Sequence, residues 1–222
     1  MSLDNRTDLA APGIAYYFWL LSDWAYLGGP RLEAIARRHG VAIEYIPLPL
    51  PDIYACMGGI LLAQRAPQRQ AYRVAELKRW RERLGMRCNI EPKHFPVDVD
   101  LASCVIVAAI QAKHPVSALT HRFLGALWAE DRDISDLAVV AAIVGEEGLD
   151  AQSLLRKSEE DDVRAAYQAN IDRAVAGGVF GSPFYIFDRQ VFWGQDRLDM
   201  LEDAIVKRRL RDGLDLGRSP EP

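Results

Sequence analysis

Gly177-Gly-Val-Phe-Gly-Ser-Pro183 is a glycine-rich loop that runs directly into Phe184-Tyr-Ile-Phe187, a short apolar and aromatic segment. The pair Asp188-Arg189 follows, and then a second segment of the same kind, Gln190-Val-Phe-Trp193. Two such segments separated by a two-residue turn are typical of a β-hairpin. The pattern therefore predicts two antiparallel strands over 184–193.

Both ends of this hairpin carry further signals. Gly194 closes it, and Asp196 is expected to cap a final helix over 197–208. A proline between a glycine-rich loop and an apolar strand often marks a cis peptide, so we predict a cis bond between Ser182 and Pro183. Such a bond would present the backbone N–H and C=O of Ser182 to an extended peptide, in the manner of strand addition. An ordinary trans turn is the alternative.

The beginning of the chain supplies a complementary half of a sheet. Ile14-Ala-Tyr-Tyr-Phe-Trp-Leu-Leu21 fits a strand that is buried on both faces. Ser22-Asp23 then offers N-cap chemistry for a helix that ends at His39-Gly40, and Val41–Ile46 reads as a second strand. Strand, helix and strand in this order predict a parallel crossover unit.

The residues between these halves show helical periodicity and no strand signal. The predicted helices cover 67–84, 98–112, 115–130, 134–144 and about 150–176. We therefore expect an α/β chain with a thioredoxin-like fold (β-α-β … β-β-α) and a large all-helical insertion. Its thioredoxin-like domain would comprise 14–50 and 178–206, its insertion 65–176, and its flexible termini 1–12 and 211–222.

Composition excludes several classes of function. The chain has 222 residues and a net charge of −4, so it lacks the basic field that holds nucleic acid. Its longest apolar runs fall far short of the ~20 residues of a membrane span. The first dozen residues contain Asp4, Arg6 and Asp8 and no apolar core, which argues against a signal peptide. We expect a cytoplasmic protein that binds neither nucleic acid nor membrane.

Cysteine and histidine patterns give no metal or disulfide signal. Cys56, Cys88 and Cys104 are odd in number and widely spaced, without a CxxC pair. The histidines form no HExxH or similar cluster. We expect structural or incidental thiols and no metal site.

Ser22 lies where the first strand meets its helix, the edge at which ligands gather in parallel sheets. In thioredoxin-like redox enzymes this position holds the attacking cysteine, whereas here no cysteine lies within thirty residues of the serine. Dithiol exchange is therefore excluded at this position. A serine hydroxyl can instead donate a hydrogen bond to the thiolate of another molecule and lower its pKa. The alternative is that Ser22 is only a helix cap.

Four segments together resemble the 2-hydroxychromene-2-carboxylate isomerase family, which is related to kappa-class glutathione transferases and to bacterial periplasmic disulfide oxidoreductases. The similarity covers about residues 14–206, and the last two segments are the most specific. The segments are Tyr17-Phe18-x-x-x-Ser22-x-Trp24-Ala25-Tyr26-Leu27, Tyr72-x-x-x-Glu76-Leu77-x-Arg79-Trp80, Gly178-Val-Phe-Gly-Ser-Pro183 and Phe192-Trp-Gly-Gln-Asp-Arg-Leu198.

This resemblance implies a glutathione site. Ser22 falls on the serine that contacts the glutathione sulfur, and Ser182 falls on the residue whose backbone pairs with the cysteinyl part. The segment that holds the γ-glutamyl end falls on Trp193, Gly194, Gln195 and Asp196. The Asp196 carboxylate suits an α-ammonium group, and amides at a helix start suit an α-carboxylate.

The chain departs from the family pattern at three positions. Asp23 stands where the family usually has proline, Trp19 where it often has aspartate, and Tyr54 where a lysine of the substrate pocket would fall. A carboxylate beside a thiolate opposes its ionisation, so Asp23 bears on sulfur activation. For an anionic aromatic substrate, the expected contacts are Tyr54 and cations in loops or at helix starts; those candidates are Arg69, Lys93 and His94.

The resemblance also implies an activity. It is the glutathione-dependent isomerisation of 2-hydroxychromene-2-carboxylate to trans-o-hydroxybenzylidenepyruvate, or of a close analogue, in aromatic catabolism. The expected partners are glutathione, a small aromatic acid and a second copy of the chain in a homodimer. A kappa-like glutathione transferase and a non-catalytic thioredoxin-like binding module remain alternatives.

Overall fold

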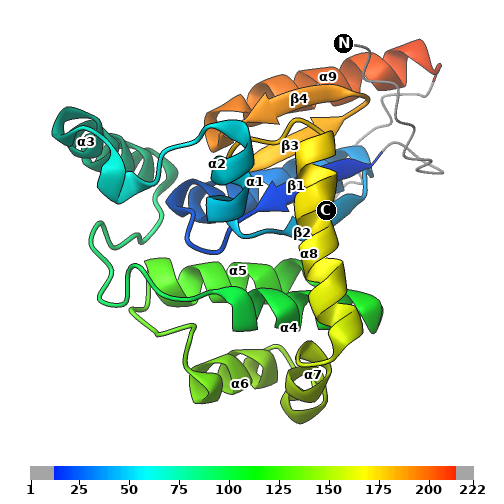
Figure 1. Cartoon of the computed structure of the whole chain (residues 1–222). Helices are drawn as coiled ribbons and strands as arrows, with labels where there is room; N and C mark the ends of the chain where they lie inside the picture. The colour runs from blue at the N-terminus through cyan, green and yellow to red at the C-terminus, as the bar shows by residue number, and fades with distance from the viewer. Residues whose placement is uncertain (1–12, 214–222) are drawn as a thin grey trace.

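The structure, a computed structural model, describes residues 13–213 (Figure 1). Strands and helices alternate at both ends of the chain, and helices alone fill the middle. In chain order the elements are β1 (Ile14–Phe18), α1 (Asp23–His39), β2 (Ile43–Pro47), α2 (Leu50–Met57), the 3-10 helix η1 (Leu62–Gln64), α3 (Pro67–Leu84), α4 (Asp100–Gln111), α5 (Ser117–Trp128), α6 (Leu137–Glu146), α7 (Ala151–Ser158), α8 (Asp161–Ala176), β3 (Phe184–Phe187), β4 (Gln190–Trp193), the 3-10 helix η2 (Gln195–Arg197) and α9 (Leu198–Arg211).

One mixed sheet joins the two ends of the chain in the order β2-β1-β3-β4. β1 pairs in parallel with β2, where Tyr16 lies opposite Tyr45, and antiparallel with β3, where Tyr16 lies opposite Tyr185. Within residues 98–176 of the described chain there is no strand. The predicted thioredoxin-like fold with a helical insertion is thus confirmed, and so is the packing of both halves into one sheet.

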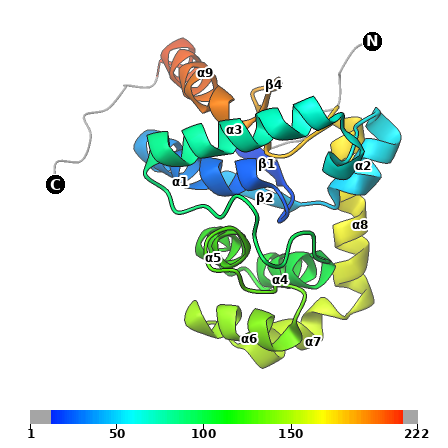
Figure 2. The same cartoon turned by 90° about the vertical axis from the view of Figure 1, so that its left-hand side faces the viewer.

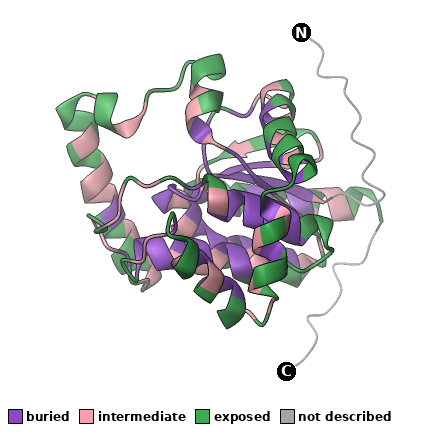
Figure 3. Ribbon diagram, turned by 60° about the horizontal axis from the view of Figure 1, so that its bottom comes forward, coloured by how far each residue is buried: buried purple, intermediate pink, exposed green. Residues whose placement is uncertain are grey.

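Side chains of β1 alternate between two apolar cores, as the period of a strand requires. Ile14, Tyr16 and Phe18 face the larger core, which also contains the apolar sides of α1, α9 and helices α4 to α7. Ala15 and Tyr17 face a smaller core with α2 and α8. Figure 3 shows the resulting buried layer through the sheet and its flanking helices. Burial of β1 on both sides explains its uninterrupted apolar sequence.

The helical middle differs from expectation in two places. α2 was not predicted, because the prolines that end β2 also read as breakers; instead Pro49 takes the N-cap position and Pro51 lies in the first turn. The stretch expected as one helix over 150–176 is two helices. The chain turns at Glu159-Glu160, so that α7 packs on α4 and α6 while α8 reaches α2 and β2.

The last helix also differs from expectation. A 3-10 turn precedes it, and α9 begins at Leu198 with no side-chain cap, so the predicted capping role of Asp196 is wrong. The helix continues to Arg211, where the flexible C-terminus was expected to begin. The rest of the expected flexible termini, residues 1–12 and 214–222, lies outside the described residues. None of the described helices is both long and apolar enough to cross a membrane.

Gly29 allows α1 and α5 to approach closely. A Cβ atom at this position would lie 2.0 Å from Cε1 of His121 on α5. We expect Gly29→Ala to destabilise the fold by ~1–3 kcal/mol, because the imidazole must move out of a packed site. The matched control is Gly145→Ala in α6, where a Cβ meets nothing within 4 Å. That change should stabilise by about 0.5–1 kcal/mol. Urea unfolding of both variants checks the pair, and equal effects would contradict it.

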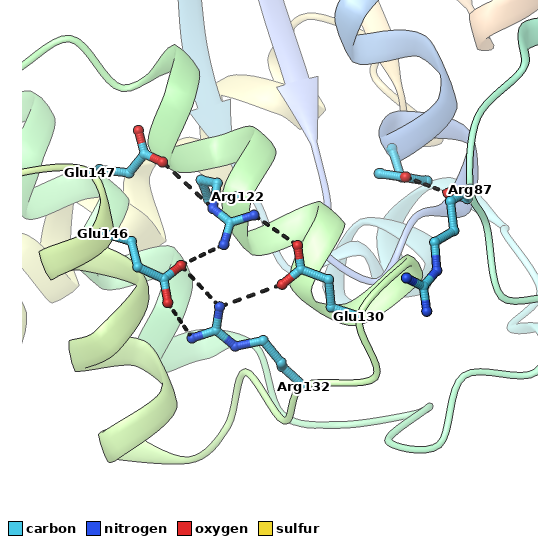
Figure 4. A network of polar contacts seen from close by, with 7 residues as sticks. Arg87, Arg122, Glu130, Arg132, Glu146 and Glu147 are labelled. Atoms are coloured by element: carbon cyan, nitrogen blue, oxygen red, sulfur yellow. Dashed lines mark hydrogen bonds and ion pairs between the residues drawn. The ribbon is translucent and has the colours of Figure 1, made fainter.

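An ion network joins α5 to α6 (Figure 4). Arg122 bridges Glu130 and Glu146 at 2.8 and 2.5 Å, and Arg132 reaches Glu146 at 3.0 Å. Hydrogen bonds from Arg132 and Arg122 lower the pKa of Glu146 to about 2. A carboxyl group whose pKa is depressed by folding stabilises the fold at pH values above its unfolded pKa of about 4.3, and that contribution disappears as the pH falls toward 2.

We therefore expect Glu146→Gln to lower the free energy of unfolding at pH 6 and to have no effect near pH 2. Because Glu146 is well exposed, solvent screening limits the loss to about 1 kcal/mol. Urea titrations of the wild type and the variant at several pH values measure this difference. A difference that stays constant across the range would contradict the assignment.

Candidate functional site

Two serines from opposite halves of the chain meet at the end of β1. The Ser22 hydroxyl donates to the backbone carbonyl of Ser182 at 3.0 Å, and the Ser182 hydroxyl accepts from the backbone N–H of Trp19 at 2.9 Å. Both serines are buried. The Ser182–Pro183 peptide is cis, which confirms the prediction. The structure thus brings together the two positions that the sequence pointed to independently.

Ser22 is also the N-cap of α1. Its backbone is extended, and its side-chain oxygen accepts from the N–H of Ala25 at 3.2 Å. Ser22 therefore does cap α1, as the alternative interpretation of this residue stated. The single hydroxyl proton, however, is not used in capping and is directed at the Ser182 carbonyl. Ser22 consequently has one proton that it can offer to an acceptor in the site.

Asp23 is buried beside Ser22 and is paired with Arg73 of α3. One of its carboxylate oxygens accepts from the N–H of Trp24 at 2.7 Å. Burial raises the pKa of Asp23, and the charge of Arg73 opposes that rise. The carboxylate is thus compensated by a cation within the protein.

Arg73 is the residue of this site that sequence reasoning missed. α3 lies across α1 in Figure 2, and it places the Arg73 guanidinium over the rings of Phe95 and Trp128, 5.9 and 5.8 Å from their centres. Cation–π contacts and the ion pair with Asp23 hold the side chain in place. The sequence indicated Arg73 only by its place directly after Tyr72, within the segment 72–80 that resembles the family.

The segment 193–196 lies next to the loop that carries Ser182. The exposed Trp193 ring packs edge-to-face on Phe180, with ring centres 4.9 Å apart, and covers Gly181. A Cβ at Gly181 would lie 2.2 Å from the indole nitrogen, so this approach requires glycine. Gly194 has a φ of 99°, a conformation that favours glycine.

Gln195 and Asp196 face different surroundings. Gln195 is buried, and Arg31 of α1 donates to its backbone and side-chain oxygens at 3.2 and 3.0 Å. Its role in the structure is to fix the turn against α1. Asp196 is exposed, and its carboxylate lies 3.3 Å from the guanidinium of Arg197.

Within the described residues, no hydrogen bond or ion pair joins the four candidate substrate contacts to one another. The backbone N–H of Lys93 donates to Asp131 at 2.9 Å. The Tyr54 hydroxyl accepts a hydrogen bond from Arg65 at 3.3 Å. Arg69 lies exposed in the first turns of α3. His94 lies 3.5 Å from Asp133. Burial is the main cause of the raised pKa of Tyr54, and the charge of Asp23 adds to it.

The two buried cysteines do not supply a nucleophile to the site. Cys88 is buried. Its burial, with a smaller contribution from the charge of Asp23, raises the pKa of its thiol to about 11. Burial raises the pKa of Cys104 in the same way, also to about 11. Both thiols are protonated at neutral pH and hence unreactive. Cys56 is exposed.

Comparison with known proteins shows the family of this chain. The family model of the DsbA-like thioredoxin domain matches residues 13–206. A 2-hydroxychromene-2-carboxylate isomerase of Sphingobium xenophagum is 31% identical over 87% of this chain and 97% of its own length. The chain belongs to the 2-hydroxychromene-2-carboxylate isomerase family. A second isomerase of this name, from Pseudomonas putida, is 27% identical over 91% of the chain and 98% of its own length.

Solved structures show the same fold for this isomerase family member. A 2-hydroxychromene-2-carboxylate isomerase superimposes with a TM-score of 0.74 at 22% identity, covering 92% of this chain and 99% of the other. The cytosolic disulfide reductase DsbM of Pseudomonas aeruginosa, solved with GSH, gives a TM-score of 0.66 at 19% identity, covering 90% and 99%.

Proposed function

We propose that this chain is a glutathione-dependent isomerase that converts 2-hydroxychromene-2-carboxylate, or a close analogue, to trans-o-hydroxybenzylidenepyruvate in aromatic catabolism. Its relatives of that name match nearly the whole chain. The observation that carries the proposal is the hydrogen bond from Ser22 to the Ser182 carbonyl. It unites the residue assigned to the glutathione sulfur with the residue assigned to the glutathione backbone.

The residues present suit a glutathione molecule. The Ser182 backbone would pair with the cysteinyl part, and Trp193, Gly194, Gln195 and Asp196 would surround the γ-glutamyl end. Gln195 is locked by Arg31, so it would shape the turn, whereas the exposed Asp196 carboxylate is available to an ammonium group. A charge-assisted hydrogen bond at this point is stronger than a neutral one.

Ser22 would act on the sulfur. Bound glutathione supplies a thiolate that adds reversibly to the conjugated substrate. Ser22 donates its one hydroxyl proton toward the sulfur in place of the Ser182 carbonyl, and this bond lowers the pKa of the thiol. The Ser182 carbonyl, released from Ser22, can accept a backbone N–H of the ligand. The chain thus orients the thiol and stabilises its ionised form.

Pairing of Asp23 with Arg73 removes the main argument for a non-catalytic binding module. An unpaired carboxylate next to Ser22 would oppose formation of a thiolate. Arg73 offsets that charge from within the protein. A kappa-like transferase would use the same residues, so the two enzymatic functions differ in the reaction alone. A homodimer and a cytoplasmic location remain expectations.

A panel of aromatic substrates assayed with and without glutathione tests the proposal. An isomerase should convert the chromene carboxylate only when glutathione is present, without consuming glutathione. A transferase would consume glutathione and release a conjugate. Absence of both activities, together with an unchanged thiol pKa for bound glutathione, would refute an enzymatic function. Light scattering of the same protein measures its oligomeric state.

A further inference from the structure

The charges next to Ser22 leave one cation without an acidic partner. Asp23 is compensated by Arg73 in a buried ion pair. A second arginine, Arg65, is near enough for its charge to lower the pKa of Asp23 slightly, yet no carboxylate within the described residues lies at ion-pair distance from it. Arg65 is therefore a cation near Asp23 whose charge no ion pair among the described residues neutralises.

Hydrogen bonds hold the Arg65 guanidinium in a fixed orientation. Its Nε donates to the carbonyl of Ile60 at 2.9 Å, and one Nη donates to the Tyr54 hydroxyl at 3.3 Å. The Arg65 carbonyl accepts from the side chain of Gln70 at 2.7 Å, which fixes the backbone before α3. A guanidinium has five N–H donors in a planar fork, so these two bonds leave most of its donors for an anion.

Tyr54 is itself held firmly. The backbone at Gly59 folds against its ring, where a Cβ would lie 1.9 Å from Cδ1. The ring also packs against the smaller core, as does Trp19, whose backbone N–H contacts Ser182. The phenol that orients Arg65 is thus anchored to the same part of the fold as the two serines.

The segment that holds this cation also exposes apolar side chains. Ile60, whose carbonyl accepts from Arg65, has 51% of its surface exposed, and Met57, three residues earlier at the end of α2, has 37%. A fixed cation next to exposed aliphatic and thioether side chains is complementary to an aromatic ring that bears a carboxylate.

We propose that Arg65, oriented by Tyr54 and the Ile60 carbonyl, binds the carboxylate of the aromatic acid substrate, with Met57 and Ile60 against its ring. This inference rests on the proposed function and replaces Arg69, Lys93 and His94 as the expected cations. A guanidinium fork matches a carboxylate in a two-bond arrangement, which orients the acid as well as attracting it.

Binding of an unreactive acid tests the proposal without turnover. Coumarin-3-carboxylate is titrated into the wild type, Arg65→Met and Arg69→Met by calorimetry, and so is its uncharged ethyl ester. We expect Arg65→Met to weaken binding of the acid by about tenfold to a hundredfold and to leave the ester unchanged. Arg69→Met, which removes an exposed arginine four residues further on, should affect neither ligand.

Glutathione affinity and melting temperature of each variant are measured alongside. Both should match the wild type for Arg65→Met. An unchanged melting temperature shows that the variant is folded, and an unchanged glutathione affinity shows that Arg65 does not contribute to glutathione binding. If the wild type fails to bind glutathione, the proposed function fails while the acid titrations still decide the role of Arg65. Equal loss of acid and ester, or equal loss in the two arginine variants, would overturn a specific carboxylate contact.

Discussion

Asp196→Asn is expected to weaken glutathione binding by about tenfold to a hundredfold, the equivalent of ~1.5–3 kcal/mol for a hydrogen bond to a charged group. The variant keeps the shape of the side chain and removes its charge. Asp196 is exposed and caps no helix, so the change should leave the melting temperature nearly unaltered. Calorimetry of glutathione binding measures the effect.

Asp199→Asn provides the matched control for this experiment. Asp199 lies three residues further along and is also an exposed carboxylate with an arginine partner, Arg31 at 2.8 Å. Its replacement should leave glutathione affinity close to that of the wild type. If the Asp196 variant also binds as the wild type does, the glutathione assignment as a whole loses its support.

Ser22→Ala should raise the thiol pKa of bound glutathione and reduce turnover by about tenfold or more. The reason is the loss of the hydroxyl proton that Ser22 can direct at the sulfur. Affinity for glutathione at pH 7 should change less, because the backbone of Ser182 and the segment 193–196 remain. Titration of thiolate absorbance in the wild type and the variant measures the shift.

Comparison with Ser22→Gly separates this role from helix capping. Alanine at an N-cap costs about 1 kcal/mol of stability, whereas glycine costs only a few tenths. The two variants should therefore differ in melting temperature and lose turnover equally. A turnover loss that follows stability, with an unaltered thiol pKa, would leave Ser22 as a cap alone.

Features encoded by neighbouring residues could be predicted from the sequence. The hairpin over 184–193 has its strands as expected, because apolar and aromatic segments on both sides of a two-residue turn specify it locally. Asp188 and Arg189 both adopt positive φ, which suits such a turn. α3 has the expected bounds, since Pro67 begins it and Gly85 ends it.

Features that depend on distant contacts could not be predicted in this way. The pairing of Asp23 with Arg73 depends on how α3 lies over α1, and local patterns do not encode that crossing. The position of Arg65 likewise depends on the Tyr54 ring and on the fold of the chain at Gly59. Asp196 stands two residues after Gly194, which closes the last strand, and an aspartate at such a place suggests a helix cap, yet a 3-10 turn occupies the place of the expected helix start.

The bond between Trp19 and Ser182 joins residues 163 positions apart, and this separation bears on how the chain is made. When β1, α1 and β2 leave the ribosome, β1 has only one of its two neighbouring strands. The helices that follow have contacts near to them in sequence, such as α4 with α5 and α6 with α7, so they can form during synthesis. β3 closes the open edge of β1 only after helices α2 to α8 have been made, and until then the nascent chain exposes an unpaired strand.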